Sequence, residues 1–339
     1  MAVSLKPLNQ QIIVITGATS GIGLSTAREA AEAGAKLVLA ARSEDDLTTL
    51  AKEIRSAGGA ASTVVADVGN QDDVRRIAEA AIADFGRIDT WVNNAGVSIV
   101  GRLEEVAIED SRRLFDTTYW GVVHGSLEAA KHLKERGGAL INVGSTASDR
   151  AFPLQGMYCA AKHAVKGFTD ALRLELEEEK APISVTLIKP AGIDTPYTEH
   201  AKNYLAEQPK LPPPVYTPDE VANAILQAAT RPMRDVYVGG GSKMLSTMGK
   251  IAPRLTDKYM ELAMFEQQKS DQPAHDRQGA LHRPGGGLRE RGAHPGYVMK
   301  TSLYTRAALH PVVTGVVLGV AGAMIFGGRQ ALLSSRAGS

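Results

Sequence analysis

Short apolar runs recur along the first 240 residues, and stretches with helical periodicity separate them. Several runs are rich in Val and Ile, which is typical of strands buried on both faces of a parallel sheet. We predict strands near residues 11–16, 36–41, 61–66, 88–92, 138–144, 183–188 and 235–239. We predict helices near residues 21–33, 43–57, 70–85, 105–135, 156–180 and 217–230.

This alternation of strand and helix predicts an α/β fold: a doubly wound parallel sheet of seven strands with helices on both faces, spanning residues 1–240. Right-handed crossovers place the loops that follow parallel strands at one edge of the sheet. Ligands bind at that carboxyl edge in folds of this type. Polar motifs far apart in the sequence are therefore expected to share one cleft.

The chain beyond residue 240 divides into three parts. Residues 241–269 carry apolar side chains at helical spacing, so we expect an amphipathic helical extension, interrupted at Pro253, that packs on its own domain, on a second subunit or on a membrane. Residues 270–298 are rich in Pro, Gly, His and Arg, which predicts a flexible linker. The linker's three histidines lack metal-site spacing and are expected to be solvated.

Residues 299–339 contain an apolar segment, 307–328, without Asp, Glu, Lys or Arg. A helix of that length spans roughly 30 Å, enough for the hydrocarbon core of a bilayer. Gly315 and Gly319 form a G-x-x-x-G pair suited to helix packing. We expect a membrane anchor here, with an apolar helix docked on protein and a disordered tail as alternatives.

The composition limits the classes of function that the chain can have. The chain has 38 Lys and Arg against 37 Asp and Glu, so no overall positive field favours nucleic acid. The single cysteine, Cys159, excludes an internal disulfide and is expected to pack as a small apolar residue. Residues 1–10 lack an apolar stretch of secretory length, so we expect a cytoplasmic main domain.

A glycine-rich turn follows the first predicted strand, at Thr16 to Gly23, and leads into a helix. Gly17, Gly21 and Gly23 allow the backbone to turn tightly and to approach a diphosphate at the start of that helix. The second predicted strand ends at Ala41 and Arg42, where an acid would bind a ribose 2′-hydroxyl. A guanidinium suits a 2′-phosphate instead, so the sequence favours NADP(H) over NAD(H). A surface arginine is the alternative.

Tyr158 and Lys162 stand four residues apart on a predicted helix, with Ser145 upstream. This spacing places the two side chains on one helix face. A nearby ammonium favours the phenolate, so we expect Lys162 to lower the tyrosine pKa from its usual value of about 10. Ser145 would then hydrogen-bond the oxygen of a reacting carbonyl. The pattern predicts acid–base catalysis at a carbonyl or alcohol.

These motifs together resemble the short-chain dehydrogenase/reductase family in its single-domain branch, whose fold is a Rossmann sheet. Asn93 to Gly96 resembles the segment that ends its fourth strand, and Pro190 to Thr195 resembles the loop that holds its nicotinamide. The resemblance implies that Ser145, Tyr158 and Lys162 are catalytic and that Lys162 also binds the nicotinamide ribose. It implies these cofactor-binding residues: Gly17, Thr19, Ser20, Gly21, Ile22, Gly23, Arg42, Asp67, Val68, Asn94, Ala95, Gly96, Tyr158, Lys162, Pro190, Ile193 and Thr195.

Two positions depart from the family pattern. Members usually have an asparagine 27 residues before the catalytic serine, where it holds a water of a proton relay, and this chain has Thr118. A threonine hydroxyl is shorter and lacks the paired donor and acceptor of an amide, so we expect slower or pH-shifted turnover. Ala191 replaces a common glycine and concerns local loop geometry only.

The sequence thus predicts an NADP(H)-dependent oxidoreductase that transfers a hydride between the nicotinamide and a carbonyl or secondary alcohol, with no metal. The substrate is expected to be a small carbonyl or alcohol, and a lipophilic one if the chain is membrane-tethered; the resemblance implies a homodimer or homotetramer. The alternative is a catalytically weak NADP(H)-binding sensor or scaffold, motivated by Thr118 and the long C-terminal part.

Overall fold

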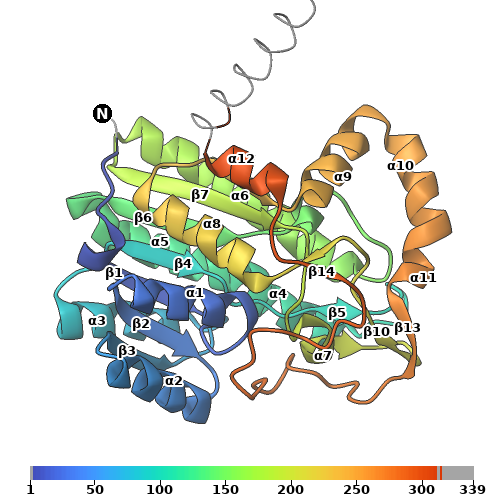
Figure 1. Cartoon of the computed structure of the whole chain (residues 1–339), viewed down its shortest axis with the longest axis horizontal. Coiled ribbons are helices and arrows are strands. Elements are labelled where there is room, and N and C mark those ends of the chain that lie inside the picture. The colour runs from blue at the N-terminus through green and yellow to red at the C-terminus, as the bar shows by residue number, and fades with distance from the viewer. Residues whose placement is uncertain (1–2, 311–313, 315–339) are drawn as a thin grey trace, which may run out of the picture.

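A computed structural model describes residues 3–310 and residue 314. Its centre is a seven-stranded parallel sheet in the order β12-β7-β6-β4-β1-β2-β3 (Figure 1). The strands are β1 (Ile12–Thr16), β2 (Lys36–Ala41), β3 (Ala60–Val65), β4 (Thr90–Asn93), β6 (Gly138–Val143), β7 (Ile183–Pro190) and β12 (Asp235–Val238). All seven strands lie where the apolar runs predict them, and the predicted fold class is confirmed.

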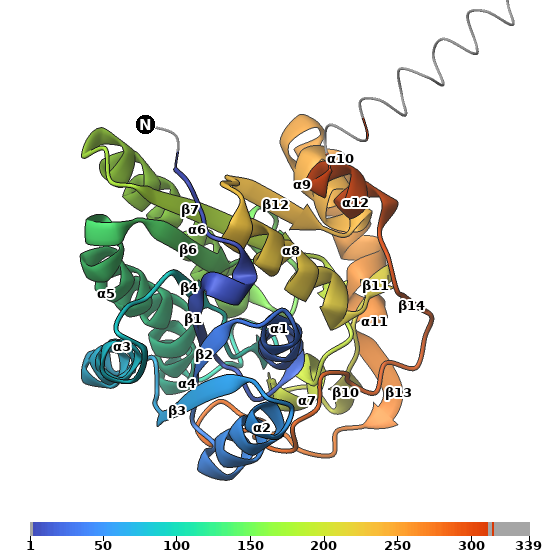
Figure 2. The same cartoon turned by 60° about the vertical axis from the view of Figure 1, so that its left-hand side comes forward.

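Helices cover both faces of the sheet (Figures 1 and 2). One face packs against α1 (Gly21–Glu32), α2 (Glu44–Ser56) and α8 (Pro218–Thr230), whose buried Leu, Ile, Val and Ala side chains form one core cluster with the sheet. The other packs against α3 (Gln71–Phe85), α5 (Gly121–Arg136) and α6 (Gly156–Glu178) in a second cluster. The two layers explain why the strands are apolar on both sides.

The helix expected over residues 105–135 consists of α4 (Ile108–Phe115), a π-helical turn at Asp116–Trp120 and then α5. Thr118 lies inside the π-helical turn and is fully buried. Single π-helical turns inside α-helices frequently occur at functional sites. Here the turn brings Thr118 against the segment that follows β4.

The extension after β12 is helical. It contains α9 (Gly240–Ile251), α10 (Pro253–Tyr259), a π-helical turn at Met260–Met264 and α11 (Phe265–Gln267). The break between α9 and α10 falls at Pro253, as the sequence predicts. Ser246 of α9 and Tyr237 of β12 both donate hydrogen bonds to Asp149, which also pairs with buried Lys189 at 3.2 Å. These contacts fix α9 beside the carboxyl edge of the sheet.

Residues 270–298, predicted as a flexible linker, instead lie against the main domain. After β13 (Lys269–Pro273), which pairs with β10 (Glu207–Pro209), the chain crosses the carboxyl edge of the sheet and reaches β14 (Val298–Met299), beside β11 (Val215–Tyr216) (Figure 1). We call residues 274–297 the strap. Ala280 and Leu281 are buried within it. Backbone hydrogen bonds attach the strap, a device that leaves no hydrophobic periodicity in the sequence.

Five further elements lie near the same edge. They are the short strands β5 (Ile99–Val100), β8 (Gly192–Ile193) and β9 (Lys202–Asn203), helix α7 (Tyr197–His200), and helix α12 (Leu303–Leu309), which lies beside the sheet. Within the described part of the chain, no helix combines the length and apolar character needed to cross a bilayer. Most of the predicted anchor, residues 311–313 and 315–328, lies outside the described residues.

Candidate functional site

A cavity of about 260 Å³ opens at the carboxyl edge of the sheet. Its walls come from the loops after β1, β4, β6 and β7, from the start of α6, and from α9. A smaller chamber adjoins it beside the ends of β2 and β3. Gly17, Ser20 and the segment 95–97 line both spaces, so the two form one continuous cleft.

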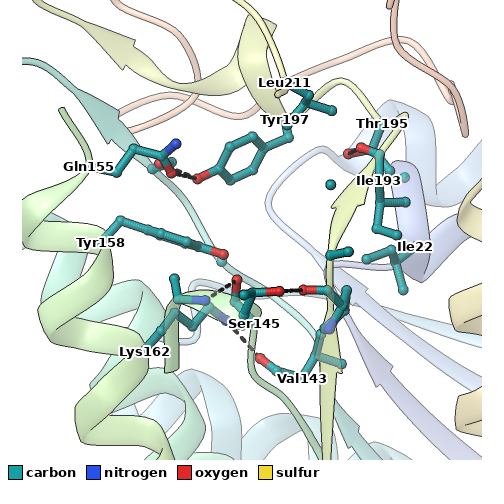
Figure 3. Close-up of a pocket in the computed structure, with 18 of the residues that line it drawn as sticks. Ile22, Val143, Ser145, Gln155, Tyr158, Lys162, Ile193, Thr195, Tyr197 and Leu211 are labelled. Atoms are coloured by element: carbon teal, nitrogen blue, oxygen red, sulfur yellow. Dashed lines mark hydrogen bonds between the residues drawn. The ribbon is translucent and has the colours of Figure 1, made fainter. Parts of the chain in front are cut away.

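Ser145, Tyr158 and Lys162 meet in the larger cavity (Figure 3). Ser145 follows β6 and caps a short 3₁₀ turn, in which its hydroxyl accepts a hydrogen bond from the amide of Ala147 at 3.0 Å. Tyr158 and Lys162 lie on the first turns of α6. The Lys162 ammonium is nearly buried and donates to the carbonyl of Val143 at 2.7 Å. Its nitrogen lies 5.7 Å from the centroid of the Tyr158 ring.

Burial determines the protonation states of Tyr158 and Lys162. Loss of solvation raises the pKa of Tyr158 to about 12, and hydrogen bonding with Ser145 works only partly against it. Burial also lowers the pKa of Lys162 to about 8. The expected lowering of the Tyr158 pKa is therefore not found as a net effect: the cavity removes water from the phenol, which dominates, and the Lys162 ammonium donates its hydrogen bond to Val143. A neutral Tyr158 is a proton donor.

A second tyrosine lies above the first. The Tyr197 ring meets the Tyr158 ring edge to face, with centroids 5.6 Å apart. Its hydroxyl donates to Gln155 at 2.8 Å and shares a 2.7 Å hydrogen bond with Ser98 (Figure 3 draws the first). Burial raises the pKa of Tyr197 well above its usual value. Tyr197, Gln155 and Ser98 thus form part of the cavity wall opposite Ser145.

The rest of the large cavity is mainly apolar. Side chains of Phe152, Leu211, Leu245 and Met264 line it, together with prolines 212–214. Leu245 comes from α9 and Met264 from the π-helical turn after α10, so the C-terminal extension builds part of the wall. The lining suits an apolar molecule with one oxygen placed beside Ser145 and Tyr158.

The glycine turn has the close contacts expected of a phosphate-binding backbone. Gly17 has φ +67°, in the left-handed region that favours glycine. A Cβ on Gly23 would lie 2.1 Å from the carbonyl oxygen of Gly17, so only glycine fits there. The Asn94 amide donates to the carbonyls of Thr16 and Gly17 at 3.0 and 3.2 Å and ties the turn to the end of β4.

Arg42 lines the smaller chamber with Asp67 and Val68. Its guanidinium donates to the strap carbonyls of Ala280, at 2.5 Å, and Leu281, at 3.2 Å. Asp67 pairs with Arg113, which also donates to Leu281. The strap therefore forms one side of this chamber.

Comparison with known proteins decides the family. Residues 11–205, more than half of the chain, match the family model described as short chain dehydrogenase. The chain belongs to the short-chain dehydrogenase/reductase family. It is an oxidoreductase of that family, whose cofactor is NAD(P)(H).

Relatives span most of this short-chain dehydrogenase/reductase. It is 50% identical to an uncharacterized oxidoreductase, YxnA, of Bacillus subtilis (strain 168), over 93% of this chain and 89% of that protein. It is 39% identical to 11-beta-hydroxysteroid dehydrogenase A of Sesamum indicum, over 56% of this chain and 54% of that protein. The structure of an alcohol dehydrogenase from Thermococcus sibiricus complexed with 5-hydroxy-NADP is similar, with TM-score 0.60, 27% identity, and coverage of 67% and 95%.

The cleft of this short-chain dehydrogenase/reductase gathers nearly all the residues singled out in the sequence. Those lining either space are Gly17, Thr19, Ser20, Gly21, Ile22, Arg42, Asp67, Val68, Asn94, Ala95, Gly96, Ser145, Tyr158, Lys162, Pro190, Ile193 and Thr195. Gly23 and Thr118 line neither space. The Thr118 hydroxyl instead accepts from the amide of Val97 at 3.2 Å and donates to its carbonyl at 3.1 Å.

Neither Tyr197 nor His200 belongs to a sequence motif, and the strap has no hydrophobic pattern that would predict it. Tyr197 and His200 lie in a polar loop region, where α7 has only four residues and no periodic signal. His282, expected to be solvated, pairs with Asp110 at 2.6 Å. The described residues contain no group of side chains arranged to hold a metal ion.

Proposed function

We propose that this short-chain dehydrogenase/reductase is an NADP(H)-dependent carbonyl reductase that also oxidises the corresponding secondary alcohol. The observation that carries the proposal is the meeting of Ser145, Tyr158 and Lys162 in one cavity with the glycine turn. Nicotinamide chemistry supplies the hydride when the cofactor is bound. The chain's own residues handle the proton and the oxygen.

Tyr158 is proposed as the proton donor to the developing alkoxide. Its raised pKa keeps the phenol protonated at neutral pH, as reduction requires. The Ser145 hydroxyl, whose oxygen accepts from Ala147, can turn its own proton from the Tyr158 phenol to the substrate oxygen. Lys162 stabilises the tyrosine after it has given up its proton, since an ammonium favours a nearby phenolate.

The fit of a dinucleotide rests on the turn and on Arg42. The contacts of Gly23 leave no room for a side chain, so the backbone itself forms the cradle. Arg42 keeps guanidinium N–H groups beyond the two that meet strap carbonyls, and its position beside Ser43 supports a 2′-phosphate site. The relative crystallised with 5-hydroxy-NADP supports the same preference.

A lipophilic ketone or alcohol is the proposed substrate class. Phe152, Leu211, Leu245 and Met264 provide an apolar wall facing Ser145 and Tyr158. The relative named 11-beta-hydroxysteroid dehydrogenase A supports this class. Membrane attachment through residues 307–328 and a homo-oligomer stay predictions, which vesicle flotation and sedimentation would test.

The direct test is oxidation of NADPH, and of NADH in parallel, by the purified protein with a panel of ketones and aldehydes that includes steroids. We expect turnover that prefers NADPH and is lost in Tyr158→Phe. Tight NADPH binding without turnover on any carbonyl would favour the alternative, an NADP(H)-binding sensor or scaffold.

A further inference from the structure

His200 lies where the two spaces of the cleft meet. It is the last residue of α7 and lines both the large cavity and the smaller chamber. The other residues that line both are in the glycine turn or just after β4: Gly17, Ser20, Ala95, Gly96 and Val97. The diphosphate of a dinucleotide joins its nicotinamide half to its adenosine half, so it must pass this junction. His200 is the contribution of α7 to the junction.

The strap holds His200 in this place. The amide of Ala280 donates to the His200 carbonyl at 2.7 Å. Gly285 packs on the imidazole so closely that a Cβ there would lie 2.7 Å from Nε2. Within residues 3–310, His200 hydrogen-bonds through its backbone, from its amide to Pro196 and to its carbonyl from Ala280, and neither ring nitrogen bonds to the protein. The ring is thus positioned by packing and keeps its hydrogen-bonding capacity for a ligand in the cleft.

The electrostatic surroundings of His200 suit an anion. Burial lowers the pKa of its imidazole; Glu199 on α7 opposes this, whereas Arg289 of the strap and Arg42 after β2 lower it further. Arg289 itself pairs with Glu199. An anion bound at the junction would counter both the burial and the two guanidinium groups, and would favour the protonated ring.

We propose that His200 is a cofactor-binding residue that donates a hydrogen bond to the diphosphate of the bound dinucleotide. This inference rests on the proposed dinucleotide site and adds to it a residue from outside the glycine turn. It also gives the strap a function, because Ala280 and Gly285 hold the histidine at the junction.

The test compares a ligand that reaches the junction with one that does not. NADPH contains the diphosphate, whereas adenosine 2′-monophosphate has only the adenosine and its 2′-phosphate. Affinities of the full-length protein for both are measured by calorimetry for wild type, His200→Ala and His200→Gln. His275→Ala is the matched control, because His275 is an exposed strap histidine that lines neither space.

We expect His200→Ala to weaken NADPH binding about fivefold to tenfold, the effect of one hydrogen bond of about 1 kcal/mol or slightly more. Binding of adenosine 2′-monophosphate should change less than twofold, and His200→Gln should restore part of the loss through its amide. His275→Ala should match wild type for both ligands. In wild type, NADP⁺ affinity should rise more steeply from pH 8 to pH 6 than in His200→Gln, because only wild type gains a charge there.

Three results would overturn the proposal. They are unchanged NADPH affinity in His200→Ala, an equal loss for NADPH and adenosine 2′-monophosphate, and identical pH profiles for wild type and His200→Gln. A wild-type protein that binds neither NADPH nor NADH would instead refute the proposed function, and the role of His200 with it.

Discussion

At the scale of single residues, the two protonation states in the cavity predict the pH dependence of reduction. Lys162, with a pKa near 8, loses its charge above that pH, whereas Tyr158, with a pKa near 12, keeps its proton. We expect kcat/KM for carbonyl reduction to be flat below about pH 8 and to fall above it, as the ammonium that stabilises the phenolate disappears. Initial rates from pH 6 to 10 measure this; a plateau extending to pH 10 would contradict it.

Thr118 gives a second prediction at this scale. Its hydroxyl satisfies both backbone polar groups of Val97 in a fully buried place. Thr118→Val keeps the shape and removes both hydrogen bonds, so we expect a loss of about 1–3 kcal/mol in the free energy of unfolding. Thr118→Ser keeps the hydroxyl and is the control. Urea denaturation of the two variants tests this, and equal midpoints would show that the hydroxyl does not contribute.

At the scale of elements, the strap attaches through positions that tolerate only glycine. Gly279 has φ +54°, and a Cβ there would lie 2.4 Å from the carbonyl oxygen of His200. We expect Gly279→Val to detach the strap and to speed NADPH dissociation severalfold. Trypsin should then cleave after the arginines at 283, 289 and 291, whose side chains are already exposed but whose backbone the attached strap holds in place. Gly286→Ala, whose Cβ would have only Asp46 nearby at 3.9 Å, is the matched control. Limited proteolysis and stopped-flow fluorescence measure both effects, and equal rates in the two variants would contradict the prediction.

The same elements show which parts of the fold and of the site could be predicted from the sequence. The seven strands were predictable because a strand buried on both faces has a continuous apolar run. The main helices were predictable because a helix that packs on one face has apolar residues at helical spacing. The glycine turn and the Tyr158 and Lys162 pair were predictable because they are local. The strap was not, since beside Arg42 and His200 it attaches through the amide of Ala280, the carbonyls of Ala280 and Leu281, and the close contact of Gly285. Backbone groups are present in every sequence and carry no signal.

At the scale of the whole molecule, the C-terminal part is structurally continuous with the main domain. Arg289 in the strap accepts from the amide of Gly21 through its carbonyl, and Glu290 pairs with Arg28 of α1 at 2.6 Å. Further along, Thr305 of α12 accepts from the amide of Gly239, and Leu309 joins the core cluster of α1 and α8. Residues 270–310 thus close the cleft and complete the core.

This continuity predicts opposite results for two truncations. A chain ending at His310 keeps the strap and α12, so we expect its melting temperature and NADPH affinity to match those of the full chain. A chain ending at Gln268 exposes the surfaces that Leu281 and Leu309 cover. We expect its free energy of unfolding to fall by roughly 3–6 kcal/mol, because two buried leucine side chains are lost. Its melting temperature should fall by roughly 5–15 °C, and its NADPH affinity should weaken with the loss of the support for His200. Calorimetric melting and NADPH titration of the three chains measure the melting temperature and the NADPH affinity. If the chain ending at Gln268 behaves like the full chain, residues 270–298 act as a linker in solution, as their composition first indicated.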